Sequence, residues 1–309
     1  MAVWIILGVV LFLLIAILVI SYACFRMAFY QKDRGPKDDS IRLPKGEIYE
    51  EFRDKITEFV KEVRAMPHED VSITSYDGLK LVGKYYEYEP GATIELMFHG
   101  YRGSAECDLA GGVQRCFALK RSALIVSQRC SDESDGNVIT FGIREHKDCL
   151  SWVDFMLKRF GPDVKIILTG ISMGASTVLL AADKELPPNV IGILADCGYS
   201  SAKDIIKKVI KQMGLPVTLS YPFVRLGGLL YGRFDIEETS PEETLKNCKV
   251  PVIFYHGESD DFVPCEMSKI NYDACSAKKK LITVEGAGHG LSYLVAPEKY
   301  LTTLDDFFK

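Results

Sequence analysis

The sequence predicts an α/β domain with a doubly wound, mostly parallel sheet and a helical cap insert, preceded by one N-terminal transmembrane helix. From residue 94 onward, short apolar segments typical of strands alternate with helical segments. Among them, the stretch IILTGISMGASTVLLAA at 166–182 places a serine between two glycines where a strand meets a helix. Residues 1–25 contain no charged side chain. These patterns together indicate one α/β domain tethered to a membrane.

Residues 1–25 are long enough to cross a bilayer, because as a helix they rise about 35 Å against a hydrocarbon core of about 30 Å. A cleaved signal peptide is the alternative, but no basic region precedes the segment and no convincing A-x-A site follows it before Arg26. The positive-inside rule places the rest of the chain in the cytoplasm, because basic residues follow the span: Arg26, Lys32, Arg34 and Lys37. We expect a single-pass membrane protein that contacts the lipid bilayer through residues 1–25.

Residues 26–46 are expected to form a juxtamembrane linker, since their polar sequence is interrupted by proline and glycine. The folded domain is then expected over 47–309. It begins with a helix over 47–66, where apolar residues recur at helical spacing opposite a polar face. A hairpin follows over 71–88, because apolar and polar residues alternate around Asp77-Gly78.

Six further apolar strands follow the hairpin: IELMFHG, ALIVSQ, VKIILTG, VIGILAD, VPVIFYHG and KLITVEG. Helical segments such as 144–160 lie between them, which is typical of a parallel sheet covered on both faces. Residues 200–246 break this alternation with helical and apolar material. We expect them to form a cap above the carboxyl ends of the strands.

Composition disfavours several kinds of function. The chain of 309 residues has a net charge of -5 and no basic stripe, so nucleic acid is not an expected partner. Its nine cysteines form no CxxC motif and no cluster with histidine, which argues against a disulfide framework and a structural zinc site. A reducing compartment fits this cysteine usage best. We also expect no metal and no organic cofactor.

The residues just after the strands of a doubly wound sheet meet at one edge, so they are the first candidates for chemistry. Ser172 follows one strand, Asp260 follows a later one and His289 follows the last. A serine hydroxyl needs an imidazole to take its proton, and a carboxylate must orient that imidazole. We expect Ser172 to attack, His289 to move the proton and Asp260 to hold His289. Asp261 and Asp196 are the alternatives for the acid.

The segment MFHGYRGS indicates a fourth component of this site. It ends an early strand at His99-Gly100, where a backbone amide can point toward the serine. In acyl transfer the carbonyl oxygen gains negative charge, and backbone amides stabilise it. We expect an oxyanion hole made by the amides of Tyr101 and Met173.

With the motifs FHGYRGS, GISMGA, HGESDDFVP and GAGHG, residues 70–309 resemble the α/β-hydrolase superfamily of serine hydrolases. More narrowly, the chain resembles membrane-anchored bacterial α/β-hydrolases related to the prolyl-oligopeptidase-like group. The resemblance implies hydrolysis of an ester, a thioester or an amide. It assigns the acid to Asp260, within His-Gly-x-x-Asp-x-x-Val-Pro, and the base to His289. It also implies structural roles for His99 and His256.

Each candidate has a structural alternative. Ser172 could cap a helix, although a cap does not need glycines on both sides. His289 could be a surface residue of a glycine-rich loop, and Asp196 could belong to a structural turn. Cys197 could act as a nucleophile only with a second histidine nearby. A helical run of lysines predicts a solvated face, with attraction to anionic lipid headgroups as the alternative: Lys203, Lys207, Lys208 and Lys211.

The expected function is that of a serine hydrolase that cleaves carboxylic esters or thioesters through an acyl-enzyme on Ser172. Esters are favoured over peptides because the sequence shows no appended recognition domain. A serine peptidase or acyl-peptide hydrolase is the alternative, and a non-catalytic binding module on the same fold is a third hypothesis. The apolar cap residues either contact the acyl group as a lid or pack on the sheet: Leu219, Leu229, Leu230 and the candidate substrate-binding residues Phe223 and Leu226.

Overall fold

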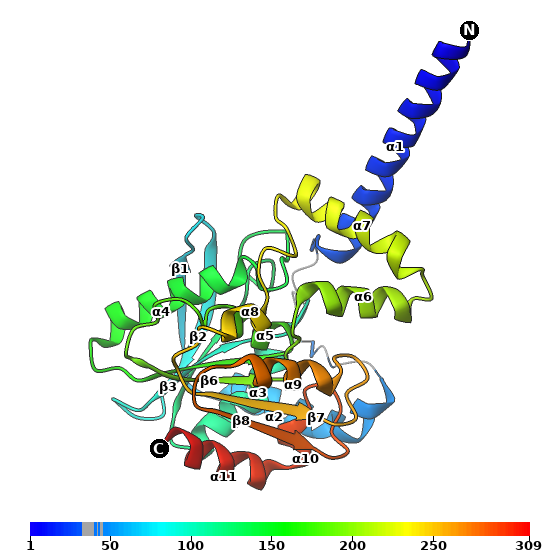
Figure 1. Ribbon diagram of the computed structural model, residues 1–309. Coiled ribbons are helices and arrows are strands. Elements are labelled where there is room, and N and C mark those ends of the chain that lie inside the picture. Colours follow the sequence, from blue (N-terminus) through cyan, green and yellow to red (C-terminus); the bar gives the residue numbers. More distant parts are fainter. Residues whose placement is uncertain (33–39, 42, 44–45) are drawn as a thin grey trace.

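The computed structural model describes residues 1–32, 40–41, 43 and 46–309. Its centre is an eight-stranded sheet in the order β1-β2-β4-β3-β5-β6-β7-β8. The pairs β1–β2 and β2–β4 are antiparallel, and the remaining neighbours are parallel. Figure 1 shows helices on both faces, so the predicted fold class is confirmed. The strands are β1 (Glu69–Thr74), β2 (Lys80–Tyr86), β3 (Ile94–Phe98), β4 (Ser122–Val126), β5 (Ile166–Ile171), β6 (Val190–Asp196), β7 (Val252–Gly257) and β8 (Lys279–Val284).

Successive residues of the central strands point into two cores, one on each face of the sheet. Leu168 and Phe254 belong to the core under α4, α5, α8 and α9, while Ile167 and Tyr255 face the side covered by α2, α3, α10 and α11. Both faces are therefore buried, as parallel strands require. The helices are α2 (Arg53–Ala65), α3 (Ala105–Ala118), α4 (Glu145–Phe160), α5 (Met173–Leu180), α8 (Pro241–Leu245), α9 (Cys265–Ala274), α10 (Ser292–Val295) and α11 (Pro297–Phe308), with the 3₁₀ turns of η1 (Glu47–Phe52) before α2.

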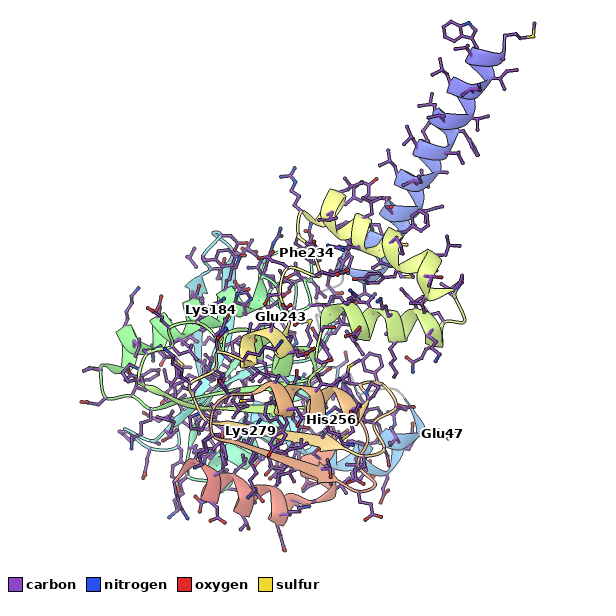
Figure 2. The ribbon with its side chains drawn as sticks, in the orientation of Figure 1. Glu47, Lys184, Phe234, Glu243, His256 and Lys279 are labelled. Carbon is purple, nitrogen blue, oxygen red and sulfur yellow. The ribbon has the colours of Figure 1, made fainter. Side chains whose placement is uncertain are left out.

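The N-terminal apolar segment forms α1 (Ala2–Ala28), which is long and apolar enough to cross a membrane. Its last turn extends past residue 25 and packs into the domain. Phe29 is fully buried, and its ring lies 5.8 Å from that of Phe141 and 5.1 Å from that of Phe234. Phe234, labelled in Figure 2, belongs to the insert over 200–246. Of the predicted linker over 26–46, residues 26–28 thus belong to α1, and residues 33–39, 42 and 44–45 lie outside the described residues.

The insert over 200–246 folds as a helical cap. The cap consists of α6 (Ala202–Gln212), α7 (Val217–Gly227) and the short π-helical turn η2 (Gly228–Gly232), whereas α8 at the end of the insert packs on the core of the sheet. Ser201 caps α6 by accepting a hydrogen bond from the Asp204 amide, and Ile205, Ile206 and Ile210 form its buried face. Figure 1 shows α7 across the base of α1, on the side of α6 that faces away from the sheet.

Candidate active site

Ser172 sits at a sharp turn between β5 and α5. Its φ of 57° and ψ of -120° are strained for a residue with a side chain. The flanking glycines make this turn sterically accessible. A Cβ on Gly170 would lie 2.2 Å from backbone atoms of Gly174, and a Cβ on Gly174 would lie 2.0 Å from the carbonyl oxygen of Phe98. The turn therefore requires both glycines, and it exposes the serine at the carboxyl edge of the sheet.

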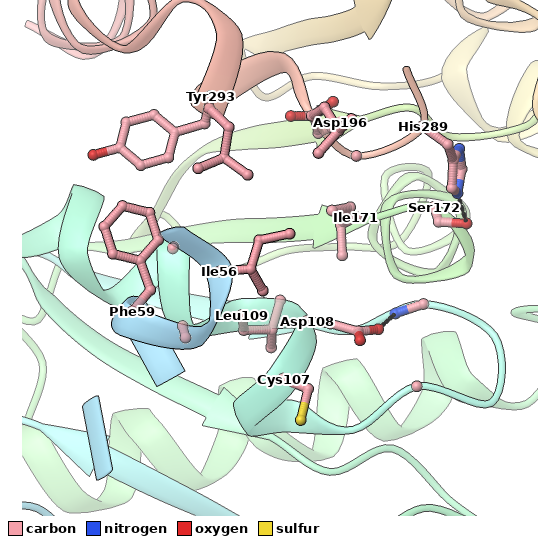
Figure 3. A pocket seen from close by; sticks show the side chains of 18 of the residues that line it. Ile56, Phe59, Cys107, Asp108, Leu109, Ile171, Ser172, Asp196, His289 and Tyr293 are labelled. Atoms are coloured by element: carbon pink, nitrogen blue, oxygen red, sulfur yellow. Dashed lines mark hydrogen bonds between the residues drawn. The ribbon is translucent and has the colours of Figure 1, made fainter. Parts of the chain in front are cut away.

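The side chains of Ser172, His289 and Asp260 form a hydrogen-bonded line. The distance from Ser172 Oγ to His289 Nε2 is 2.9 Å, and from His289 Nδ1 to Asp260 Oδ2 it is 2.7 Å. Because the carboxylate can only accept, Nδ1 carries the proton and Nε2 is free to accept one from Ser172. Figure 3 shows Ser172 and His289 together at the end of a cavity. The arrangement can deprotonate the serine hydroxyl.

Asp260 is fixed by bonds to both carboxylate oxygens. Its Oδ1 accepts from the amides of Phe262 at 2.9 Å and Val263 at 2.8 Å, and His256 Nε2 lies 3.2 Å from Oδ2. Burial alone would raise the pKa of Asp260, but the hydrogen bonds with His256 and His289 hold this pKa well below its usual range. His256, labelled in Figure 2, is itself fixed by Ser268 Oγ at 2.6 Å. His256 therefore helps to hold the Asp260 carboxylate in place.

The two other candidate acids point elsewhere. Asp196 is buried, and its carboxylate accepts from Ser292 Oγ at 3.2 Å and from Tyr300 Oη at 2.9 Å. Burial raises the pKa of Asp196. Asp261 is exposed, and its backbone carbonyl accepts from Lys208 of the cap. Only Asp260, among these three, is hydrogen-bonded to His289.

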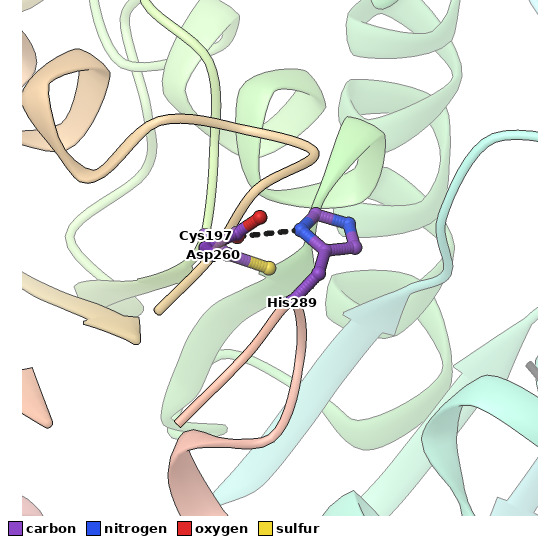
Figure 4. A group of neighbouring side chains, drawn as sticks. All are labelled: Cys197, Asp260 and His289. Carbon is purple, nitrogen blue, oxygen red and sulfur yellow. Dashed lines mark hydrogen bonds and ion pairs between the residues drawn. The ribbon is translucent and has the colours of Figure 1, made fainter. Parts of the chain in front are cut away.

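Cys197 lies beside the acid and the base. Its sulfur, a carboxylate oxygen of Asp260 and a ring nitrogen of His289 lie within 4.8 Å of one another. Figure 4 shows these three side chains together. Such a trio could in principle hold a metal ion. However, burial and the neighbouring carboxylates raise the pKa of the thiol well above its usual value, and a thiolate is the form that binds metals and attacks carbonyls. The neutral thiol is better explained as a packing residue beside the hydrogen-bonded line.

The loop after β3 contributes to the site through its backbone. The neighbouring Gly100 amide donates to Asp108 Oδ2 at 3.0 Å, and His99 Nδ1 lies 2.8 Å from the Gly100 carbonyl oxygen. A Cβ on Gly100 would lie 3.6 Å from that of Ser172, so this loop passes directly beside the nucleophile. On the other side, the Met173 amide belongs to the first turn of α5, where helix amides lack an intrahelical partner. The Tyr101 amide follows Gly100 in the same loop.

Sequence patterns did not indicate two further contacts of this loop. Asp108, in α3, lines the cavity and holds Gly100, and removal from water raises the pKa of its carboxyl. The Tyr101 hydroxyl donates to the carbonyl oxygen of Ala28 at 2.8 Å, which ties the loop to the end of α1. Both contacts join segments far apart in the chain. No local pattern encodes them.

A cavity of about 880 Å³ opens from Ser172 and His289. It runs between Ile171, Ile56 and Leu109 toward Phe59 and Tyr293, whose rings stack at 6.4 Å (Figure 3). Its apolar walls thus come largely from α2, α3, α10 and the ends of the strands, and none of the described residues that line it lies in the cap. Charged side chains also line the cavity: Arg53, Asp108, Arg115 and Asp196. The helical periodicity of 47–66 placed Ile56 and Phe59 on an apolar face, but it could not show what that face covers. Phe223 and Leu226, predicted to contact substrate, lie in α7 and do not line this cavity.

Comparison with known proteins gives distant relatives. No protein-family model matches the chain. The uncharacterized protein YqkD of Bacillus subtilis is 25% identical over 187 residues, and the protein bem46 of Schizosaccharomyces pombe is 25% identical over 217 residues. These matches cover 60% and 69% of this chain but 61% and 66% of the relatives, so the chain spans less than two thirds of their length.

Solved structures match more of the chain. The esterase Pf2001 of Pyrococcus furiosus superposes with a TM-score of 0.66 at 20% identity, over 90% of this chain and 97% of that one. The esterase EaEST of Exiguobacterium antarcticum gives 0.57 at 17% identity, over 77% and 98% of the two chains. Mouse alpha/beta hydrolase domain-containing protein 10 gives 0.56 at 20% identity, over 77% and 97%. At these identities the likeness concerns the fold.

Proposed function

We propose that this chain, which has the α/β-hydrolase fold, is a serine hydrolase that cleaves carboxylic esters or thioesters through an acyl-enzyme on Ser172. The main support for this proposal is the geometry of three side chains. The bonded line from Ser172 through His289 to Asp260 stands at a strained turn and opens on an apolar cavity. The esterases among the structural neighbours support an ester substrate over an amide. Water is the second substrate.

The proposed reaction needs only side chains and amides of this chain. His289 Nε2 takes the proton of Ser172 Oγ as Oγ attacks the acyl carbon, and the amides of Tyr101 and Met173 stabilise the oxyanion. The same imidazole then gives its proton to the leaving alcohol or thiol. A water molecule then attacks the acyl carbon while His289 takes its proton. The acyl–Oγ bond breaks, His289 gives that proton to Ser172 Oγ, and the carboxylic acid leaves. Asp260 stays ionised throughout and holds the tautomer.

The ester preference is tested with purified full-length protein in detergent. We expect it to hydrolyse p-nitrophenyl esters faster than aminoacyl nitroanilides, and to react with a fluorophosphonate probe that Ser172→Ala no longer binds. Faster anilide cleavage would favour a peptidase. If the wild-type protein neither turns over esters nor takes up the probe, the chain is a binding module and the proposal is wrong.

We propose that the cavity between α2, α3 and α10 holds the acyl chain. Its apolar lining suits hydrocarbon, and a Cβ on Gly111 of α3 would stand 3.4 Å from the Phe59 ring and 3.8 Å from that of Tyr293. A Cβ here would already touch these rings, so glycine at this position lets them lie close against α3. Since each buried methylene contributes about 0.8 kcal/mol, kcat/KM is expected to rise by up to about tenfold per two added carbons until the cavity is full.

A single substitution should shorten the usable chain. In Gly111→Leu the new side chain competes with the Phe59 ring for room and narrows the cavity, so kcat/KM for octanoyl and longer esters should fall about tenfold or more, while the acetyl ester is little affected. The measurement is the chain-length series of p-nitrophenyl esters. The same series on the cap variant Phe223→Ala, Leu226→Ala distinguishes the alternative. If that variant alone flattens the series, the acyl group lies under the cap and this assignment fails.

We propose that α1 remains attached as a membrane anchor with the domain on the cytoplasmic side. Removal of a signal near residue 25 would take out Phe25, which is 6% exposed, and would cut the chain just before Phe29, which is fully buried in the domain. The basic residues that follow the span support the orientation, Arg26 first among them. Protease added outside intact cells should leave the domain undigested. Digestion, or a soluble product cleaved near residue 25, would refute this topology.

A further inference from the structure

Exposed apolar side chains gather on one part of the cap. Outside α1, the large apolar side chains exposed on the described residues are Tyr76, Phe262 and five others within 213–230. We call these five the outer cap face: Met213, Leu215, Leu219, Leu229 and Leu230, exposed by 50%, 44%, 63%, 44% and 47%. They follow one another through the α6–α7 turn, α7 and η2. A cluster of this kind on an otherwise polar surface marks an interaction site.

The outer cap face is continuous with the apolar surface of α1. The Tyr231 hydroxyl donates to the carbonyl oxygen of Leu18 at 3.0 Å, and the Tyr231 and Tyr22 rings lie 5.1 Å apart. A Cβ on Gly227 would lie 2.5 Å from the Ser21 carbonyl oxygen, so α7 touches α1 at this level. Val19 and Ile20 remain 61% and 45% exposed here. The lipid that covers these two side chains must therefore reach the level of η2.

The charged residues nearby are consistent with an apolar contact. Lys203 pairs with Glu237 at 3.0 Å, and Lys208 donates to the backbone carbonyls of the loop at Asp261. Two of the four lysines of α6 are therefore engaged within the protein. Arg26 is the first charged residue after the span and follows Tyr22 by one helical turn. We take its position as the start of the headgroup layer.

We propose that the outer cap face rests in the bilayer, with Leu219, Leu229 and Leu230 at the boundary between headgroups and acyl chains. This inference rests on the proposed insertion of α1. It assigns the exposed cap leucines to lipid rather than to substrate. The membrane then holds the cap at two places, through α1 and through α7 with η2, and this fixes the orientation of the domain on the membrane surface.

The test is tryptophan fluorescence of the full chain in phosphatidylcholine vesicles. Leu219→Trp and Leu230→Trp are placed in a Trp4→Phe background, which leaves buried Trp152 as an internal reference. Vesicles whose lipids carry bromine in the upper acyl chain should quench both new tryptophans. The matched control Lys280→Trp, an exposed position on β8, should not be quenched. The readout does not depend on hydrolysis, so it is independent of the proposed activity.

Three results would overturn the proposal. Unquenched tryptophans in protein that floats with the vesicles would show that the cap stands away from lipid. Quenching only after phosphatidylserine is added would assign the contact to basic residues. Efficient cross-linking of Leu230→Cys between two copies, without quenching at Leu230→Trp, would assign the face to a second copy. Protein that does not float with vesicles would refute the anchor and this face together.

Discussion

Ser172→Ala should lower kcat for p-nitrophenyl esters by about 10⁴-fold or more, because no other group in the site can form the acyl-enzyme. His289→Ala should cost a similar factor, since the hydroxyl is a weak nucleophile without a base 2.9 Å away. The double variant should be no worse than either single variant, because the two residues act as one unit. Steady-state rates on one ester, with protein matched by thermal unfolding, measure this.

Cys197→Ala is the matched control for these losses. The thiol lies within the same cluster, yet the raised pKa keeps it neutral and it takes no part in the proposed reaction. We expect this variant to keep most of its activity and its reaction with fluorophosphonate. Loss of activity in Cys197→Ala, together with survival in Ser172→Ala, would move the nucleophile to the cysteine and contradict the proposed mechanism.

The sheet and the elements around Ser172 could be predicted because their signals are local. Gly170 and Gly174 are needed by the turn itself, and strands alternating with helices leave few other topologies. Asp260 and His289 follow strands whose carboxyl ends meet at the same edge of the sheet as Ser172. The predicted strand topology alone therefore placed these three residues at one edge of the sheet.

The cavity and the use of the cap could not be predicted in the same way. An apolar pattern in a helix shows that one face is covered, but not whether protein, substrate or lipid covers it. The pattern at Ile56 and Phe59 turned out to line the cavity. The pattern at Phe223 and Leu226 belongs to α7, next to α1. These assignments depend on contacts between segments far apart in sequence, such as Tyr231 with Leu18.

Asp260→Asn should lower kcat by about 10³- to 10⁴-fold, since the amide removes the charge that stabilises the imidazolium and can hold His289 in the wrong tautomer. The low pKa of Asp260 makes the pH dependence specific. The carboxylate stays ionised well below neutral pH, so protonation of Asp260 does not account for a fall in wild-type rate between neutral pH and about pH 5. Steady-state kcat on one p-nitrophenyl ester, with wild type and variant matched by thermal unfolding, measures the loss in Asp260→Asn.

Asp196→Asn separates the catalytic acid from its structural neighbour. Asp196 accepts from Ser292 and Tyr300, so the amide loses one acceptor and chiefly lowers the melting temperature. Its kcat should stay within about tenfold of wild type, because His289 keeps its bond to Asp260. Asp261→Asn, at an exposed position, should change little. If Asp260→Asn keeps wild-type kcat while Asp196→Asn or Asp261→Asn loses it, the acid is misassigned, because the group that orients the imidazole must be the one whose charge the reaction needs.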